Sequence, residues 1–127
     1  MKHLITGFLA ISALFFFACE EPNKKPAREM EGSYTGSMNA TWLDSNYIQN
    51  SGFVVGVKEL TKNSVLVQGD LFDQFEVLVT WNGLNVEPVD PDEPYLTEFI
   101  WIGDENKFKF KLVKPLENES AYFIGTK

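Results

Sequence analysis

The chain has 127 residues, a formal net charge of −7, one histidine and one cysteine. This length suits a single domain, and the excess of acidic residues disfavours nucleic acid as a partner. His3 and Cys19 both lie near the N-terminus, so the rest of the chain lacks the side chains of Ser-His-Asp catalysis, Cys-His catalysis and histidine-ligated zinc. We therefore expect a non-enzymatic protein with no cofactor and no metal.

Residues 1–18 have the order of a bacterial secretion signal. Lys2 comes first, an apolar stretch runs from Leu4 to Phe17, and the small residue Ala18 precedes Cys19. A membrane-spanning helix needs about 20 apolar residues, and this interrupted stretch is shorter. We therefore expect residues 1–18 to be removed as a signal peptide.

The segment Phe16-Phe17-Ala18-Cys19 resembles the lipobox of bacterial lipoproteins. The resemblance implies cleavage before Cys19 and covalent attachment of lipid to its sulfur. The protein would then be anchored to the membrane through this residue. The acidic pair Glu20 and Glu21 is similar to the start of surface lipoproteins in the Bacteroidetes. That similarity implies a cell-envelope location, in the outer membrane or at the cell surface.

Residues 19–31 have two prolines, mixed charge and no apolar period, which is typical of a flexible tether. The folded domain is expected over residues 32–127, where the pattern changes to period two. Tyr34, Met38 and Trp42 alternate with polar residues, as a half-buried strand requires. No stretch after the signal shows helical periodicity.

Seven further strands are predicted at short intervals, separated by turn-forming residues. The strongest turn signal is Trp81-Asn82-Gly83-Leu84, because Asn-Gly tolerates the positive φ of a two-residue hairpin. The seven predicted ranges are Phe53–Lys58, Ser64–Gln68, Phe75–Trp81, Leu84–Glu87, Leu96–Ile102, Lys107–Lys114 and Ala121–Gly125.

Short connections favour antiparallel neighbours, since a parallel pair needs a crossover of about a dozen residues. The expected fold is all-β, an antiparallel meander of about eight strands closed into a barrel, with a curled β-sandwich as the alternative. The segments Gly32-Ser33-Tyr34-Thr35-Gly36 and Tyr122-Phe123-Ile124-Gly125-Thr126-Lys127 resemble the first and last strands of small calycin-like, or lipocalin-like, barrels.

Large aromatic residues recur at the predicted inward positions. An eight-stranded barrel is just wide enough to be filled by side chains or to hold one small ligand, and so many rings favour a filled core. A ligand pocket is then expected where the first strand has small or pliable residues, near its open end: Gly36, Met38, Trp42 and Tyr47. The rings predicted to point inward are Tyr34, Trp42, Phe53, Phe75, Trp81, Phe108, Phe110 and Tyr122.

Two charged segments are candidate surface sites. Lysines at 107, 109 and 111 share one strand face, where ion pairs with acidic neighbours such as Glu98 are expected. Residues 87–94 concentrate acids and prolines, which indicates a solvated connector, a surface for a basic partner, or a cation loop. The carboxylates concerned are Glu87, Asp90, Asp92 and Glu93.

The leading hypothesis is a monomeric, lipid-anchored barrel that binds a small apolar ligand. The second is an envelope protein-interaction module or inhibitor that presents residues 43–52 and 87–94 as loops. A carboxylate-based hydrolase is the third, and it requires two acids that converge in a cleft.

Overall fold

The computed structural model describes residues 24–43, 45–90 and 95–127. The signal peptide, Cys19, Asp92 and Glu93 lie outside the described residues, so the predictions made for them stay predictions. The described chain contains one short helix, α2 (Pro26–Met30), and two 3-10 turns, η2 (Gly103–Glu105) and η3 (Pro115–Glu117). Its strands are β1 (Gly32–Trp42), β2 (Ser45–Thr61), β3 (Ser64–Gln68), β4 (Phe75–Asn82), β5 (Asn85–Pro88), β6 (Leu96–Ile102), β7 (Lys107–Lys114) and β8 (Glu119–Thr126).

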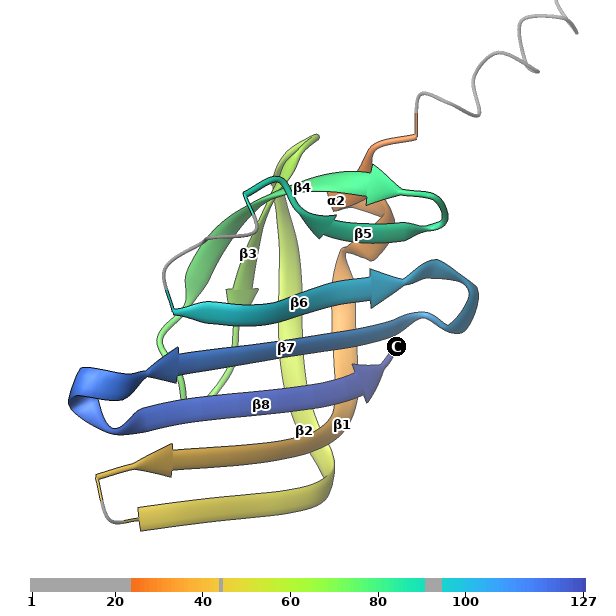
Figure 1. Cartoon of the computed structure of the whole chain (residues 1–127). Helices are drawn as coiled ribbons and strands as arrows, with labels where there is room; N and C mark the ends of the chain where they lie inside the picture. The colour runs from red at the N-terminus through yellow and green to blue at the C-terminus, as the bar shows by residue number, and fades with distance from the viewer. Residues whose placement is uncertain (1–23, 44, 91–94) are drawn as a thin grey trace, which may run out of the picture.

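These eight strands of the described chain form a closed barrel in sequence order (Figure 1). Each strand pairs antiparallel with the next, and β1 pairs with β8 to complete the ring. The predicted all-β meander barrel is therefore confirmed, and the sandwich alternative is not adopted. Strand β1 closes the ring, because it pairs with β2 along one edge and with β8 along the other.

The turn between β4 and β5 is a two-residue hairpin, shifted by one position from the prediction. Asn82 pairs with Asn85, so Gly83 and Leu84 are its central residues. Gly83 has a φ of +65°, which a glycine adopts without the steric cost that a side chain would bring. The Asn-Gly signal located the hairpin but not its centre.

Strand β2 begins at Ser45, whereas Phe53 was expected to be its first residue. The segment Asn50-Ser51-Gly52 has the composition of a turn, but it is a bulge within one long strand. The β1–β2 register shifts between Gly36 and Met38, and Gly52 has a φ of +78°. The prediction that residues 43–52 form a loop is therefore wrong, since residues 45–52 belong to β2.

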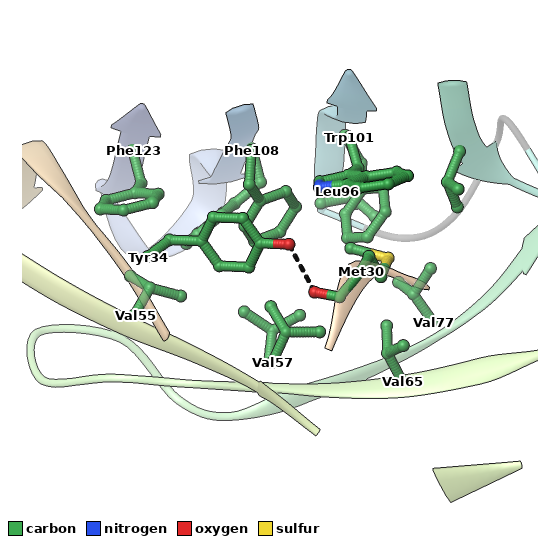
Figure 2. Packing of buried hydrophobic residues seen from close by; sticks show 14 of the residues in the cluster. Met30, Tyr34, Val55, Val57, Val65, Val77, Leu96, Trp101, Phe108 and Phe123 are labelled. Carbon is green, nitrogen blue, oxygen red and sulfur yellow. Dashed lines mark hydrogen bonds between the residues drawn. The ribbon is translucent and has the colours of Figure 1, made fainter. Parts of the chain in front are cut away.

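Aromatic side chains fill the barrel interior (Figure 2). Phe108 and Phe110 are fully buried, with ring centroids 5.4 Å apart, and the rings of Phe110 and Phe123 are 5.7 Å apart. The alternation of β1 is confirmed, because Tyr34 and Met38 are buried. The filled core expected from the many inward rings is thus present.

Seven of the eight rings predicted to point inward are buried or packed against the core, and Tyr122 is the exception. In β8 the buried positions are Ala121, Phe123 and Gly125, which leaves Tyr122 on the outer face. There the ammonium of Lys111 lies 5.9 Å from its ring centroid. The predicted phase of β8 was wrong by one residue, and Phe123 takes the inward place.

Helix α2 closes one end of the barrel, where residues 19–31 were expected to be a flexible tether. Ala27 and Met30 are fully buried in the core cluster, and Pro26 occupies the first turn of the helix. The Tyr34 hydroxyl, also buried, donates a hydrogen bond to the Met30 carbonyl (Figure 2). A helix of five residues is too short to show a 3.6-residue period, which is why the sequence pattern missed it.

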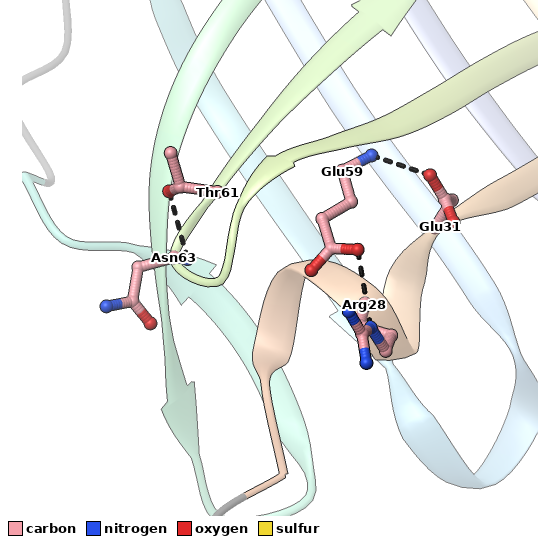
Figure 3. Close-up of polar contacts among 5 residues, drawn as sticks. All are labelled: Arg28, Glu31, Glu59, Thr61 and Asn63. Atoms are coloured by element: carbon pink, nitrogen blue, oxygen red, sulfur yellow. Dashed lines mark hydrogen bonds and ion pairs between the residues drawn. The ribbon is translucent and has the colours of Figure 1, made fainter.

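Polar contacts hold α2 against β2 (Figure 3). Arg28 pairs with the Glu59 carboxylate at 3.3 Å, and the Glu59 backbone N–H donates to the Glu31 carboxylate at 2.9 Å. On the neighbouring turn, the Asn63 backbone N–H donates to the Thr61 hydroxyl at 3.2 Å. The tips of β2 and α2 are therefore joined at this closed end.

The C-terminal residue fastens the same end from the other side. The Lys127 ammonium donates to the carbonyls of Glu29 and Glu31, at 2.9 and 2.8 Å, and lies 5.6 Å from the ring centroid of Tyr34. Burial lowers the pKa of Lys127, against the opposing effect of the nearby Glu29 and Glu31 carboxylates. The closed end thus combines α2, the tip of β2 and the chain terminus.

Because the Tyr34 hydroxyl is buried, the free energy of unfolding should change with pH in the alkaline range. Burial raises the pKa of Tyr34 well above its usual value of 10.0, and the Trp101 side chain partly opposes that shift. Above about pH 10 the unfolded chain loses this proton while the folded chain keeps it, so the free energy of unfolding falls by up to about 1.4 kcal/mol per pH unit. Lys127, with its lowered pKa, acts in the opposite direction, and its effect lies mainly below its usual pKa of 10.5, where the unfolded chain keeps the lysine proton that the folded chain has lost.

Comparing the protein with Tyr34→Phe separates the pH dependence of stability that Tyr34 causes from the one that Lys127 causes. At pH 7 the variant should be less stable by about 1–2 kcal/mol, because the buried Met30 carbonyl loses its donor. That deficit should shrink between about pH 10 and pH 11, since the variant has no phenol at this position to ionise. Urea unfolding at a series of pH values measures both effects, and a deficit that is constant with pH would contradict this assignment.

Candidate functional site

A cleft of about 560 Å³ lies at the barrel end opposite α2. Strands β1, β3, β5 and β7 run toward this end, which we call the mouth. The cleft is within the usual size range of small-molecule sites, about 300–1,000 Å³. Its lining residues are Thr41, Trp42, Leu71, Phe72, Asp73, Gln74, Phe75, Tyr95, Leu112, Lys114, Glu119, Ser120 and Ala121.

Aromatic rings from the β3–β4 connection and the core form one wall of the cleft. Phe72 lies 6.0 Å from Phe75 and 5.1 Å from Phe110, measured between ring centroids. A positive φ at Leu71 and the glycine at position 69 shape this connection, since a Cβ on Gly69 would lie 2.8 Å from the Phe72 ring. The connection thus folds Phe72 back against the core, below the open cleft.

The rim is polar, and Lys114, the basic residue among the described lining residues, has acidic neighbours. The Lys114 ammonium lies 3.6 Å from the Asp73 carboxylate and 3.9 Å from that of Glu117. It also lies 5.7 Å from the ring centroid of Tyr95. Glu119 adds a further acid to the lining. The cleft therefore offers apolar surface and acidic groups, and no lysine or arginine among its lining residues lacks an acidic neighbour.

The predicted pocket residues on β1 and β2 share a face but do not all line the cleft. Trp42 is part of its wall, while Met38 is buried in the core and does not line the cleft. Tyr47 pairs with the buried Ala40, which places Tyr47 on the inner face, where 40% of its surface is exposed and its hydroxyl donates to Gln49 at 2.7 Å. Tyr47 is not among the residues that line the cleft.

Gly36 lies in a tight contact between strands. It pairs with Gly125, and a Cβ added to it would lie 2.0 Å from the Ile124 carbonyl oxygen. This close approach is the reason for glycine here, as at other sites where a second backbone comes close to a strand. The space next to Gly36 is therefore occupied by the β8 backbone.

The acidic connection between β5 and β6 is described only in part. Glu87 accepts a hydrogen bond from Asn82 at 3.0 Å, and Asp90 is exposed. Within the described ranges, no group of three or more acidic, histidine or cysteine side chains is placed to hold a metal ion. The possible cation site at Glu87, Asp90, Asp92 and Glu93 stays a prediction, because two of its members lie outside the described residues.

The lysines of β7 form the expected surface pairs. Lys109 lies 3.8 Å from Glu98 on the adjacent strand β6, which confirms the predicted cross-strand pair. Lys107 lies 3.8 Å from Glu105, and Lys111 covers Tyr122. Exposed pairs of this kind each contribute a fraction of a kcal/mol, so this strand face is a solvated surface with local pairing.

Sequence reasoning missed most of the cleft, because its walls come from connections far apart in the chain. Phe72, Tyr95, Leu112 and Lys114 were not predicted as site residues. The available signal was the barrel topology itself, which brings the β3–β4, β5–β6 and β7–β8 connections to the same end. A second depression of about 490 Å³ lies at the closed end, beside Trp81, Leu84 and Trp101.

Comparison with protein-family models, with curated proteins and with solved structures found no significant match for this chain. Within residues 24–43, 45–90 and 95–127, no helix has the length and apolarity needed to cross a membrane. The class is therefore defined by architecture: a small, closed antiparallel meander barrel with one end plugged by a helix and a cleft at the other. This architecture is compatible with calycin-like barrels.

Proposed function

We propose that this protein is an envelope lipoprotein, anchored through Cys19, whose barrel mouth binds a small, neutral, apolar ligand. The cleft beside Trp42 carries the proposal, because it combines aromatic walls with a polar rim at an open barrel end. The packed interior counts against a ligand held deep inside the barrel, as the buried rings of Phe108, Phe110 and Phe123 show. The binding role is thus assigned to the mouth alone.

The charges at the rim favour a neutral ligand over an anionic one. Lys114 already has Asp73 and Glu117 as neighbours, and Glu119 would repel a carboxylate. A neutral molecule would gain from covering Trp42, Phe72 and Phe75 without displacing an ion pair. Burial of apolar area contributes about 25 cal/mol per Å², so a small ligand that covers these rings can bind at micromolar strength.

The neutral dye Nile red provides the test. Its fluorescence should rise on binding, and Trp42→Ala should weaken binding by about tenfold, because the substitution removes the indole from the cleft wall. Leu84→Ala is the matched control, since Leu84 lines the depression at the closed end. Both variants are first shown to be folded by circular dichroism.

If Leu84→Ala weakens binding as much as Trp42→Ala, or if neither changes it, the mouth is not the site. An anionic dye such as anilinonaphthalene sulfonate should bind more weakly than Nile red at low salt. Tighter binding of the anionic dye would contradict the neutral-ligand assignment.

A protein-interaction role is the second proposal, and it rests on exposed apolar residues around the same mouth. Leu43 and Val89, from the β1–β2 and β5–β6 connections, are 69% and 55% exposed. Scattered exposed apolar residues are common on protein surfaces, so this observation is weaker than the cleft. A complete absence of Nile red binding would favour the protein-interaction role over ligand binding at the mouth.

A further inference from the structure

The first part of β2 forms an open edge in an otherwise closed barrel. Strand β3 pairs with β2 only from Gly56 onward, whereas β1 pairs with β2 from Ser45. Among the described strands, none pairs with residues 45–52 on the side away from β1. We call this segment the open β2 edge; Figure 1 shows it at the margin of the sheet, below β1.

An open edge presents backbone N–H and C=O groups that can pair with another strand. Proteins usually protect such edges with lysine, proline or inward-pointing charges. From Ser45 to Val57 the open β2 edge has no charged residue and no proline, in a chain of which 23% of residues are charged. Its irregularity is the bulge at residues 50–52, which lies at the far end of the edge from Ser45. The edge is therefore chemically suited to strand pairing.

The sequence of the edge reads nearly the same in both directions. Ser45-Asn46-Tyr47-Ile48-Gln49-Asn50-Ser51 is palindromic about Ile48 except for the Tyr47 and Gln49 positions. When two copies of such a strand pair antiparallel about Ile48, like residues face each other. Isoleucine then opposes isoleucine, and Tyr47 opposes Gln49, within the regular part of β2. The serine and asparagine pairs involve residues 50 and 51 of the bulge.

Side-chain direction and charge are also compatible with this pairing. Ile48 pairs with the exposed Asn39 of β1, so both lie on the outer face, and 59% of the Ile48 surface is exposed. Tyr47 and Gln49 lie on the inner face, where Tyr47 donates to Gln49 within one chain, and they would oppose each other across the pair. The chain carries a net charge of −7, yet the edge places no like charges opposite one another.

We propose that two copies of this chain associate through antiparallel pairing of their open β2 edges, with a twofold axis at Ile48. A twofold axis requires a self-complementary patch, and the near-palindrome supplies one. The pairing would extend the β1–β2 ladder of one barrel into that of the other. This replaces the monomer expected from sequence, and it does not depend on ligand binding.

Disulfide trapping in the full chain tests the proposed axis. Directly opposed residues in an antiparallel pair have Cα atoms about 4.5–5.5 Å apart, a separation that a disulfide spans. With Ile48→Cys and a mild oxidant, a reducible dimer should form, about tenfold above that of Leu78→Cys, because pairing raises the effective concentration of the two thiols. Leu78 on β4 is a matched control, since it is 60% exposed. The unsubstituted chain shows any background through Cys19.

A second pair of variants tests the same edge without a crosslink. Ile48→Glu places two like charges opposite each other at the axis, and it should weaken association in sedimentation velocity by about tenfold. Leu78→Glu adds the same charge on β4 and should leave association unchanged. Equal crosslinking by the two cysteine variants, equal loss with the two glutamate variants, or a monomer at every concentration would each overturn the proposal.

Discussion

Replacing Gly36 with alanine is expected to destabilise the barrel by about 3 kcal/mol or more. A Cβ at this position would lie 2.0 Å from the Ile124 carbonyl oxygen and 2.5 Å from the Gly125 Cα. Both are backbone atoms of β8, the strand that closes the ring with β1, so no side chain can turn aside to make room. The strands must separate locally, which weakens the closing β1–β8 ladder.

Gly56→Ala is the control for this prediction. Gly56 also lies within a strand, but the nearest heavy atom to its added Cβ is the Gln68 carbonyl oxygen at 4.0 Å, and its φ is not positive. Its substitution should therefore change the free energy of unfolding by only about 0.5 kcal/mol. Urea unfolding of both variants provides the measurement. If the two substitutions cost the same, the close approach of β1 and β8 at Gly36 is not a constraint on the fold.

The contrast between these glycines shows what sequence patterns predict and what they omit. The alternation from Tyr34 to Trp42 predicted β1 and its inner face correctly, because period two depends on local geometry alone. The same pattern marked Gly36 as a small inward residue and suggested free space beside it. That space is filled by β8, and only the pairing of the first strand with the last brings Ile124 there.

Local patterns failed where one element departed from its regular form. The Asn50-Ser51-Gly52 segment has the composition of a turn, but backbone pairing on both sides of it makes it a bulge within β2. In β8, aromatic residues occupy the adjacent positions 122 and 123, so alternation alone could not decide which ring points inward. Burial of Phe123 against Phe108 and Phe110 decides it.

The cleft could be predicted least well, since it is a product of topology. Trp42 was identified because it ends the first strand at the open end of the barrel. Phe72 and Tyr95 come from separate connections that resemble ordinary solvated loops in the sequence. Their shared position depends on the meander order, in which alternate connections lie at the same end. A topology predicted from sequence could have identified these connections as the edge of a cleft, but not which of their side chains line it.

A chain that begins at Gly32 should be less stable than one that begins at Lys24 by about 4 kcal/mol or more. The shorter chain loses the fully buried side chains of Ala27 and Met30, and losing a buried methionine side chain alone costs about 2–5 kcal/mol. The truncation also removes the Met30 carbonyl, which accepts a hydrogen bond from Tyr34, and the carbonyls that accept hydrogen bonds from Lys127. The buried tyrosine hydroxyl and the lysine would then lack their partners.

Two further variants separate packing from the loss of chain length. Met30→Ala in the chain that begins at Lys24 should account for much of the deficit, because it leaves every backbone acceptor in place. Arg28→Ala should cost only about 0.5 kcal/mol, since the Arg28–Glu59 pair is largely exposed on the arginine side. Thermal unfolding compares all four chains. Equal midpoints for the chains that begin at Lys24 and Gly32 would mean that α2 is part of the tether after all, and that the barrel closes without its plug.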